Sequence, residues 1–352
     1  MSMSKEKREH IRKYILEKAA DRDEDIIQKV IDTFSVSRPT AYKYINELLS
    51  QKKIKKNGKH ISIVNQSTRI TIDMKERETL SEDIIYERNV FPLLKGLPQN
   101  VVNMWDFCTL EMLNNVIDHS QASVCDIYVI QNDIYTEIVI ADNGIGIFQN
   151  IKDHFGFHSI DDAIVELFKG KLTTDRLHHS GEGIFFSSRI MDVFAAVSDG
   201  KVFSHTDFDE SLKDLENAGV VFEKGTIIFM RLSNQSRKTN KDIMNLYADP
   251  DGGFIKTEIP IRLMFDGYPV SRSQAKRLYN RFDAFQTVEL DFSGVEDIGQ
   301  GFADELFVVF RRFHPETELI VHNASFEVQR MISHVTNSAK KRFSLASEDD
   351  IM

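Results

Sequence analysis

The chain has 352 residues, 41% hydrophobic and 28% charged, which is ordinary for a globular protein large enough to hold two or three cores. No apolar run approaches the ~20 residues of a membrane span, and the N-terminus lacks the apolar stretch of a secretory signal. We therefore expect a cytoplasmic protein without membrane attachment. The isolated Cys108 and Cys125 argue against a disulfide framework and a zinc site, and we interpret them as buried thiols.

Charge is distributed unevenly along the chain. Residues 1–65 contain 15 Lys and Arg against 9 Asp and Glu, whereas the whole chain has a net charge of −10. A basic N-terminal module on an acidic body indicates that only the first module binds a polyanion.

Residues 1–66 show three helical patterns followed by a short hairpin pattern. Apolar residues recur at helical spacing in residues 5–20, a second helical segment follows Asp25, and Ser37 is suited to cap a third. The Asn-Gly pair at residues 57–58 predicts a tight turn between two short strands. This order resembles a winged helix-turn-helix.

In that interpretation the third helix carries the contacts to DNA. The residues expected on or near its exposed side are Arg38, Thr40, Tyr42, Lys43 and Asn46. Arginine and asparagine can address base edges, and the lysines around them can contact phosphates. A solvated basic helix in a dimerisation or docking module is the alternative that the sequence leaves open.

The rest of the chain predicts two α/β bodies. Residues 67–100 have the pattern of a connector, and residues 101–232 alternate helical and strand patterns. The polar stretch 233–242 has nothing to bury and predicts a boundary, after which residues 243–345 alternate again. We therefore expect a multidomain α+β protein with an N-terminal winged helix, a central α/β sandwich and a C-terminal α/β domain.

Glu111, Asn115 and His119 are spaced by four on a predicted helix and therefore share one face. An amide oxygen suits Mg²⁺, which prefers oxygen ligands, and a carboxylate can orient or deprotonate an attacking water. Taken alone, this spacing is more typical of a solvated helix face.

Asp142 ends a strand predicted over residues 134–141 and leads into Gly144 and Gly146. Its carboxylate could accept a hydrogen bond from an adenine amino group, and the glycines would let the backbone approach a ligand closely. Taken alone, such a string often marks a simple turn.

Two later segments add elements that suit phosphates and a base. Gly181 and Gly183 precede an apolar helical run, so backbone N–H groups at a helix start could face phosphate oxygens. The polar stretch 169–179 has the character of a mobile lid, with Lys171 available to phosphates. Thr226 begins a strand and could place a hydroxyl beside an adenine.

In order and spacing, these four segments resemble the N-box, G1, G2 and terminal strand of the GHKL ATPases. That family includes gyrase B, MutL, sensor histidine kinases and anti-sigma-factor serine kinases. The resemblance covers residues 105–232 and rests on EMLNN with DHS, then DNGIG, GEG and GT. It implies ATP and Mg²⁺ as cofactors, with Glu111 as the activating carboxylate, Asn115 as the Mg²⁺ ligand and Asp142 as the adenine reader. The glycines of GEG would form the phosphate-facing hinge.

The chain departs from the family pattern after the lid. The usual GLGL is GIFFSS here, with Phe185 and Phe186 where smaller residues often stand. The N-box ends in His119, which is similar to the anti-sigma-factor kinases. No upstream helix carries the phosphoacceptor histidine of a sensor kinase.

Near the C-terminus, the segment DFSGVEDIGQGFADELF resembles STAS-like domains, the fold of anti-sigma-factor antagonists. In those antagonists a serine at the strand-to-helix turn is phosphorylated by a GHKL kinase. Here residues 298–301 are IGQG, and Ser293 lies several residues too early. We therefore expect a fixed docking surface rather than one that phosphate switches.

Together these patterns predict a DNA-binding regulator that responds to ATP and Mg²⁺ and binds a protein partner through its STAS-like domain. A homodimer is compatible with this arrangement. A serine/threonine kinase acting on a separate STAS partner is the second interpretation, and a non-hydrolysing ATP sensor or scaffold is the third.

Overall fold

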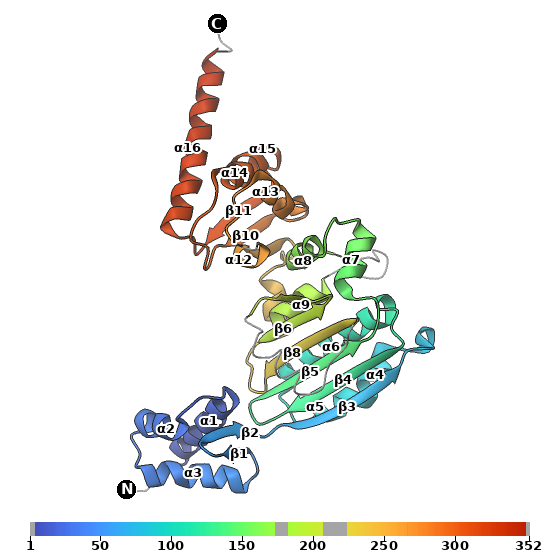
Figure 1. Ribbon diagram of the computed structural model, residues 1–352, viewed down its shortest axis with the longest axis vertical. Coiled ribbons are helices and arrows are strands. Elements are labelled where there is room, and N and C mark those ends of the chain that lie inside the picture. The colour runs from blue at the N-terminus through green and yellow to red at the C-terminus, as the bar shows by residue number, and fades with distance from the viewer. Residues whose placement is uncertain (1–3, 173–181, 207–223, 266, 350–352) are drawn as a thin grey trace.

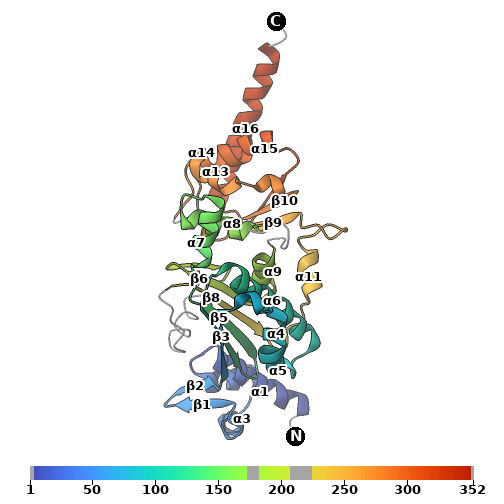
Figure 2. The same cartoon turned by 90° about the vertical axis from the view of Figure 1, so that its right-hand side faces the viewer.

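A computed structural model of the protein describes residues 4–172, 182–206, 224–265 and 267–349. The chain forms three bodies that follow one another along its long axis (Figure 1). A small helical module lies at one end, a six-stranded sheet in the middle and a three-stranded sheet beyond it, from which the last helix projects (Figure 2). The expectation of a mixed α and β protein is confirmed. Within the described residues, no helix combines the length and the hydropathy that crossing a bilayer requires.

The N-terminal module consists of three helices and a hairpin. Its elements are α1 (Lys5–Ala20), α2 (Ile26–Phe34), α3 (Arg38–Ser50), β1 (Ile54–Asn57) and β2 (His60–Ile63). The Ser4 and Ser37 side chains cap α1 and α3 by accepting a hydrogen bond from a first-turn N–H. Gly58, with a φ of +61°, forms the turn of the antiparallel hairpin. The module's core, which includes Ile15 and Leu48, is separate from the main apolar cluster of the other two bodies.

The central body is an antiparallel sheet in the order β3-β4-β5-β8-β6-β7. Its strands are β3 (Gln66–Asp73), β4 (Val124–Gln131), β5 (Tyr135–Asp142), β6 (Val193–Ser198), β7 (Lys201–Ser204) and β8 (Thr226–Ser233). Its helical segments are η1 (Arg77–Thr79), α4 (Glu82–Ile85), η2 (Tyr86–Val90), α5 (Phe91–Leu94), α6 (Gln99–His119), α7 (Ile147–Phe155), α8 (Ile160–Lys169) and α9 (Gly183–Ile190). Helix α6 packs on β5 and β8 and against α9. Along β5, Ile138 and Ile140 belong to the core shared with α6, whereas Val139 and Ala141 belong to a second cluster, as strand alternation requires.

Residues 67–100, expected to be a connector, hold elements that are part of the central body. Strand β3 pairs with β4 along its whole length, and Arg69 and Thr71 of β3 donate hydrogen bonds to the buried Asp126 carboxylate. Tyr86, which follows β3 in the sequence, is buried in the same core as α6. The first half of this edge strand is exposed, and only Ile70 and Ile72 alternate with exposed neighbours, so the apolar alternation that identifies a strand is short.

The C-terminal body is a parallel sheet in the order β11-β10-β9 with helices around it. Its elements are β9 (Lys256–Pro260), α12 (Ile261–Met264), α13 (Arg272–Tyr279), η3 (Phe282–Ala284), β10 (Thr287–Asp291), α14 (Gln300–Asp304), η4 (Glu305–Phe310), α15 (Arg311–Phe313), β11 (Glu318–His322) and α16 (Phe326–Asp349). The sequence predicts one strand over residues 256–265. The strand ends at Pro260, which has no N–H to donate to the ladder, and the chain continues as α12.

The polar stretch 233–242 is tied back to the start of α6. The Asn100 side chain donates hydrogen bonds to the carbonyl oxygens of Ser236 and Lys238, at 2.7 and 2.9 Å. Helix α11 (Asn240–Asn245) follows. Beyond it, one buried apolar cluster runs without interruption from the central body into the C-terminal body.

Candidate functional site

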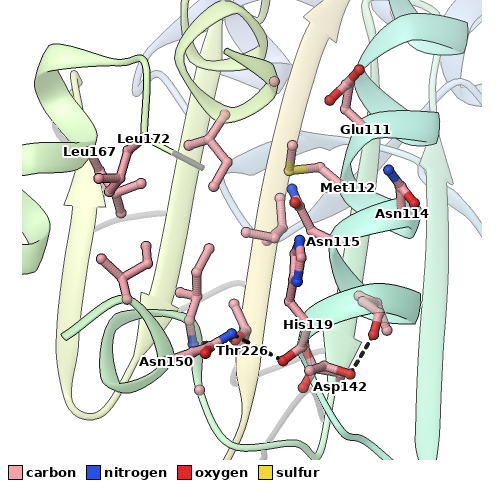
Figure 3. A pocket seen from close by; sticks show the side chains of 18 of the residues that line it. Glu111, Met112, Asn114, Asn115, His119, Asp142, Asn150, Leu167, Leu172 and Thr226 are labelled. Atoms are coloured by element: carbon pink, nitrogen blue, oxygen red, sulfur yellow. Dashed lines mark hydrogen bonds between the residues drawn. The ribbon is translucent and has the colours of Figure 1, made fainter. Parts of the chain in front are cut away.

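A pocket of about 220 Å³ opens between α6 and the helices α7, α8 and α9, with the start of β8 behind it. The predicted site residues that line it are Glu111, Asn115, His119, Asp142, Gly146, Gly183 and Thr226. Figure 3 shows Glu111, Asn115 and His119 along one side of α6, with Leu167 and Leu172 on the opposite wall. Residues that are far apart in the sequence therefore meet around one cavity.

Asp142 forms the polar floor of the pocket and is only 2% exposed. Its carboxylate accepts a hydrogen bond from the Gly144 N–H at 2.8 Å and another from the Thr226 backbone. Burial raises the pKa of Asp142 to about 6, although these two hydrogen bonds act in the opposite direction. At neutral pH the group is a buried carboxylate that keeps capacity to accept a further hydrogen bond.

Two glycines let the chain approach its neighbours more closely than any side chain would permit. A Cβ atom on Gly144 would lie 2.0 Å from the Ser120 carbonyl oxygen at the end of α6. A Cβ atom on Gly183 would lie 2.0 Å from the Glu111 Oε2, so the Glu111 carboxylate lies against the first turn of α9. Gly146 precedes α7 as its N-cap. Gly146 and Gly183 thus bring backbone, rather than side chain, to the pocket, whereas Gly144 lies outside the pocket lining.

Thr226 and Asn150 fasten α7 to the floor of the pocket. The Thr226 hydroxyl accepts a hydrogen bond from the Ile147 N–H at 2.9 Å. The Asn150 side chain donates one to the His119 carbonyl oxygen at 3.1 Å (Figure 3). Asn150 is not identifiable from the sequence, because a single asparagine on an amphipathic helix is usually solvated. The apolar wall that includes Leu167 is equally hidden, since α8 carries no motif.

Lys171, expected to contact phosphates, lies outside the pocket lining. Its ammonium donates a hydrogen bond to the Ala284 carbonyl oxygen at 2.8 Å and lies 4.8 Å from the centre of the Phe285 ring. The side chain therefore contacts the C-terminal body. Gly181 and residues 173–179 of the expected lid lie outside the described residues.

The residues expected to contact DNA all lie on helix α3: Arg38, Thr40, Tyr42, Lys43 and Asn46. Arg38, Lys43 and Asn46 are exposed, while Thr40 and Tyr42 are partly buried. The Lys56 ammonium of β1 lies 5.8 Å from the centre of the Tyr42 ring. Helix α3 and the hairpin therefore present basic groups side by side.

Within the described ranges, no group of three or more His, Cys, Asp or Glu side chains is placed to hold a metal ion. A Mg²⁺ ion at Asn115 would therefore need further oxygen ligands, which a bound nucleotide can supply. Cys108 and Cys125 are buried and form no disulfide, and burial raises the pKa of both thiols, that of Cys125 to about 12.

Residues 298–301, where the chain enters α14, carry no hydroxyl. A Cβ atom on Gly299 would lie 2.4 Å from the Val270 carbonyl oxygen, so backbone fills the position next to this turn. The Ser293 hydroxyl, which lies before the turn, donates a hydrogen bond to the Asp291 carboxylate at 2.8 Å.

Residues 274–329 match the family described as STAS-like domain of unknown function (DUF4325). No curated protein matches the chain. The matched residues run from α13 into α16 and include β10 and β11 of the parallel sheet. STAS-like domains commonly mediate protein interactions, which fits a signalling or regulatory role. The C-terminal body of this protein therefore contains a STAS-like domain.

Proposed function

We propose that the protein binds Mg·ATP in the pocket of the central body. We further propose that it is a DNA-binding regulator whose conformation changes with the bound nucleotide. The observation that supports this most is the buried Asp142 carboxylate in a pocket whose helical wall carries Glu111 and Asn115. An ionised carboxylate with so little exposure is costly unless a ligand completes its hydrogen bonding. The GHKL resemblance implies the same residues for the same roles.

At the floor of the pocket, Asp142 would accept a hydrogen bond from the amino group of adenine. Two carboxylate oxygens offer about four acceptor sites, and two backbone N–H groups use part of them. Guanine carries a carbonyl oxygen where adenine carries its amino group, and two facing acceptors would repel each other. The site would therefore select adenine over guanine.

At the other end, Glu111 lies against the start of α9, and Asn115 lines the pocket one turn further along α6. Backbone N–H groups at a helix start attract phosphate oxygens, and the Asn115 side-chain oxygen suits Mg²⁺. Bound Mg²⁺ would offset the negative charge of the phosphates there. Glu111, which lies against Gly183, would orient or deprotonate a water for attack on the terminal phosphate.

The N-terminal module supports the second half of the proposal. Arg38, Lys43 and Asn46 are exposed on α3, beside the basic hairpin. Phosphate contacts from the lysines would give affinity, and Arg38 and Asn46 could read base edges. A gel-shift titration against salt would report these contacts as a steep loss of affinity with ionic strength.

Calorimetric titration with Mg·ATP tests the pocket. Asp142→Asn replaces an acceptor with an N–H donor, so we expect at least about 10-fold weaker binding. Asp153→Asn on the exposed side of α7 is the matched control and should bind as the wild type does.

The pH dependence of Mg·ATP binding is a second test of the pocket. Because the pKa of Asp142 is about 6, wild-type affinity should fall as the pH is lowered through 6, where the carboxylate gains a proton and loses acceptor capacity. Absence of Mg·ATP binding by the wild type would show the proposal to be wrong.

The position of His119 in the pocket favours a second candidate function, a serine/threonine kinase that acts on a separate STAS partner. Incubation with γ-labelled ATP and such a partner separates the candidates. Phosphate transfer supports the kinase, and release of free phosphate alone supports the regulatory switch. A Glu111→Ala variant that keeps full regulatory function would instead support a non-hydrolysing sensor.

A further inference from the structure

We infer that the STAS-like domain sets the nucleotide affinity of the pocket through a shared wall formed by α8 and α9. This inference rests on the proposed function, because it assigns a regulator to that same pocket. One side of the wall lines the cavity. The other side packs on the C-terminal body and on residues 246–255, the linker between α11 and β9. Figure 1 shows α8 and α9 on the side of the central body that faces the C-terminal sheet.

Phe185 of α9 belongs to both sides of the wall. It lines the pocket, is almost fully buried, and its ring centre lies 4.7 Å from that of Phe254 and 5.0 Å from that of Tyr247. The ring centre of the neighbouring Phe186 lies 5.2 Å from that of Phe254. Such aromatic pairs add stability beyond the area that they bury. The two phenylalanines that depart from the GHKL pattern are thus the residues that contact the linker to the STAS-like domain.

Gly170, directly after α8, extends the same contact. It lines the pocket, and a Cβ atom there would lie 2.8 Å from the Phe254 ring and 3.0 Å from the Phe185 ring. The space behind this part of the wall is therefore filled by aromatic side chains. Because closely packed interiors transmit displacement, a shift of Phe254 would move the pocket wall.

A buried charge network holds α8 to the C-terminal body. The Lys169 ammonium is 1% exposed and donates hydrogen bonds to Glu166 at 2.5 Å and to the Asn280 carbonyl oxygen at 2.7 Å. Arg281 donates to Glu166 at 3.2 Å and to the Lys171 carbonyl oxygen at 2.5 Å. Burial lowers the pKa of Lys169 to about 8, while Glu166 acts to raise it. Separating the two bodies would leave the Lys169–Glu166 pair buried without the Asn280 carbonyl oxygen and Arg281, so the network favours one relative position of the bodies.

A second polar contact holds α9. Arg189 donates hydrogen bonds to the Glu258 carbonyl oxygen of β9 and to the His205 Nδ1, both at 3.0 Å. Its guanidinium lies 5.2 Å from the centre of the Phe185 ring. Burial lowers the pKa of His205 well below its usual value, which keeps the imidazole neutral and able to accept this bond. Both helices of the wall are therefore bonded to the C-terminal body.

A nucleotide that favours one arrangement of α8 and α9 must also favour one arrangement of the STAS-like domain. Coupling between two binding events is reciprocal. If the nucleotide changes the affinity of the STAS-like domain for its partner by some factor, the partner changes the nucleotide affinity by the same factor. Phe254, Tyr247 and Arg281 act here as positioning residues, since they contact the wall and not the cavity.

Calorimetry with Mg·ATP on the full chain tests this inference. We expect Phe254→Ala to raise the Kd roughly 5- to 50-fold, within the usual range of coupling between sites. Phe254→Leu, which retains most of the volume, should restore much of the affinity. Phe313→Ala is the matched control, because Phe313 is a phenylalanine of the C-terminal body that is 71% exposed. Circular dichroism at the titration temperature confirms that each variant is folded, and Arg281→Gln replaces Phe254→Ala if the latter is not.

Hydrogen exchange supplies a readout that a purely structural role would not change. Saturating Mg·ATP should slow amide exchange in α13 and η3 of the wild type, but not in Phe254→Ala at equal saturation. If the wild type binds Mg·ATP while Phe254→Ala and Arg281→Gln keep the same Kd, the inference is wrong and the proposed function stands. If the wild type binds no Mg·ATP, the proposed function itself fails.

Discussion

On its N-terminal side, the central body meets the first module mainly through polar groups at the surface. Lys53 forms an ion pair with Asp133 at 2.5 Å, and Asn132 donates a hydrogen bond to Asn65 at 2.9 Å. On its C-terminal side, it meets the STAS-like domain through the aromatic cluster around Phe185 and the buried Lys169 network. At the first junction two separate cores meet, with the partly buried Ile134 of the central body packed against the first of them. The second junction lies inside one continuous core.

This difference indicates that the two ends communicate with the central body in different ways. Exposed ion pairs add little stability and let a module change its orientation at little cost. Buried charges and packed rings hold one arrangement, because any alternative exposes apolar surface or strands a charge. The C-terminal junction is therefore suited to transmit a change in the pocket, and the N-terminal junction is suited to reorientation.

The largest expected effect is at the C-terminal junction. Glu166→Ala leaves Lys169 and Arg281 without their shared carboxylate, so we expect a loss of about 3–5 kcal/mol in the free energy of unfolding. Urea denaturation followed by circular dichroism measures this loss. Asp161→Ala is the control on the same helix, since its ion pair with Lys201 is exposed and should contribute at most about 1 kcal/mol. Equal losses in the two variants would contradict a buried network.

A smaller effect should stay within the first module. Leu48→Ala removes a buried side chain from a separate core and should destabilise that module by roughly 2–4 kcal/mol. Differential scanning calorimetry should show one transition moved to lower temperature, with the transition of the other two bodies unchanged. A common shift of all transitions would mean that the cores are not independent.

The smallest effect is expected at the N-terminal junction. Lys53→Ala removes an ion pair whose side chains are both more than a third exposed, so the loss should be about 0.2–1 kcal/mol. A double-mutant cycle with Asp133→Ala isolates the pair, and its coupling energy should shrink further at high salt. A coupling above about 2 kcal/mol would remove the contrast between the two junctions.

The residues whose geometry follows from local chain periodicity could be predicted. Glu111, Asn115 and His119 line one cavity because a spacing of four places side chains on one helix face. Asp142 is at the floor because it ends a buried strand. The STAS-like segment at residues 291–307 is likewise recognisable from the sequence, and it lies entirely within the family match.

Contacts between distant segments could not be predicted. Glu166 and Arg281 lie 115 positions apart, and neither stands in a motif. The sequence marks Phe185 as a departure from a family pattern but gives no sign that Phe254 covers it. Lys171 shows the same limit, because its place in a polar stretch suggests a phosphate contact, whereas its ammonium donates to the Ala284 carbonyl oxygen of the C-terminal body.

The core shared by the central and C-terminal bodies also determines where the chain can be truncated to give stable fragments. The polar composition of residues 233–242 suggests a domain boundary there. A fragment ending at that boundary would expose Phe185 and Phe186 to solvent and remove the Asn280 carbonyl oxygen from Lys169. Such a fragment would be prone to aggregate through its exposed apolar surface. A cut at residues 64–65, between β2 and β3, crosses the mainly polar junction, where the first core loses its contact with the partly buried Ile134 but keeps its own buried residues together. The working unit is therefore the central body together with the STAS-like domain, and the first module is the separable part.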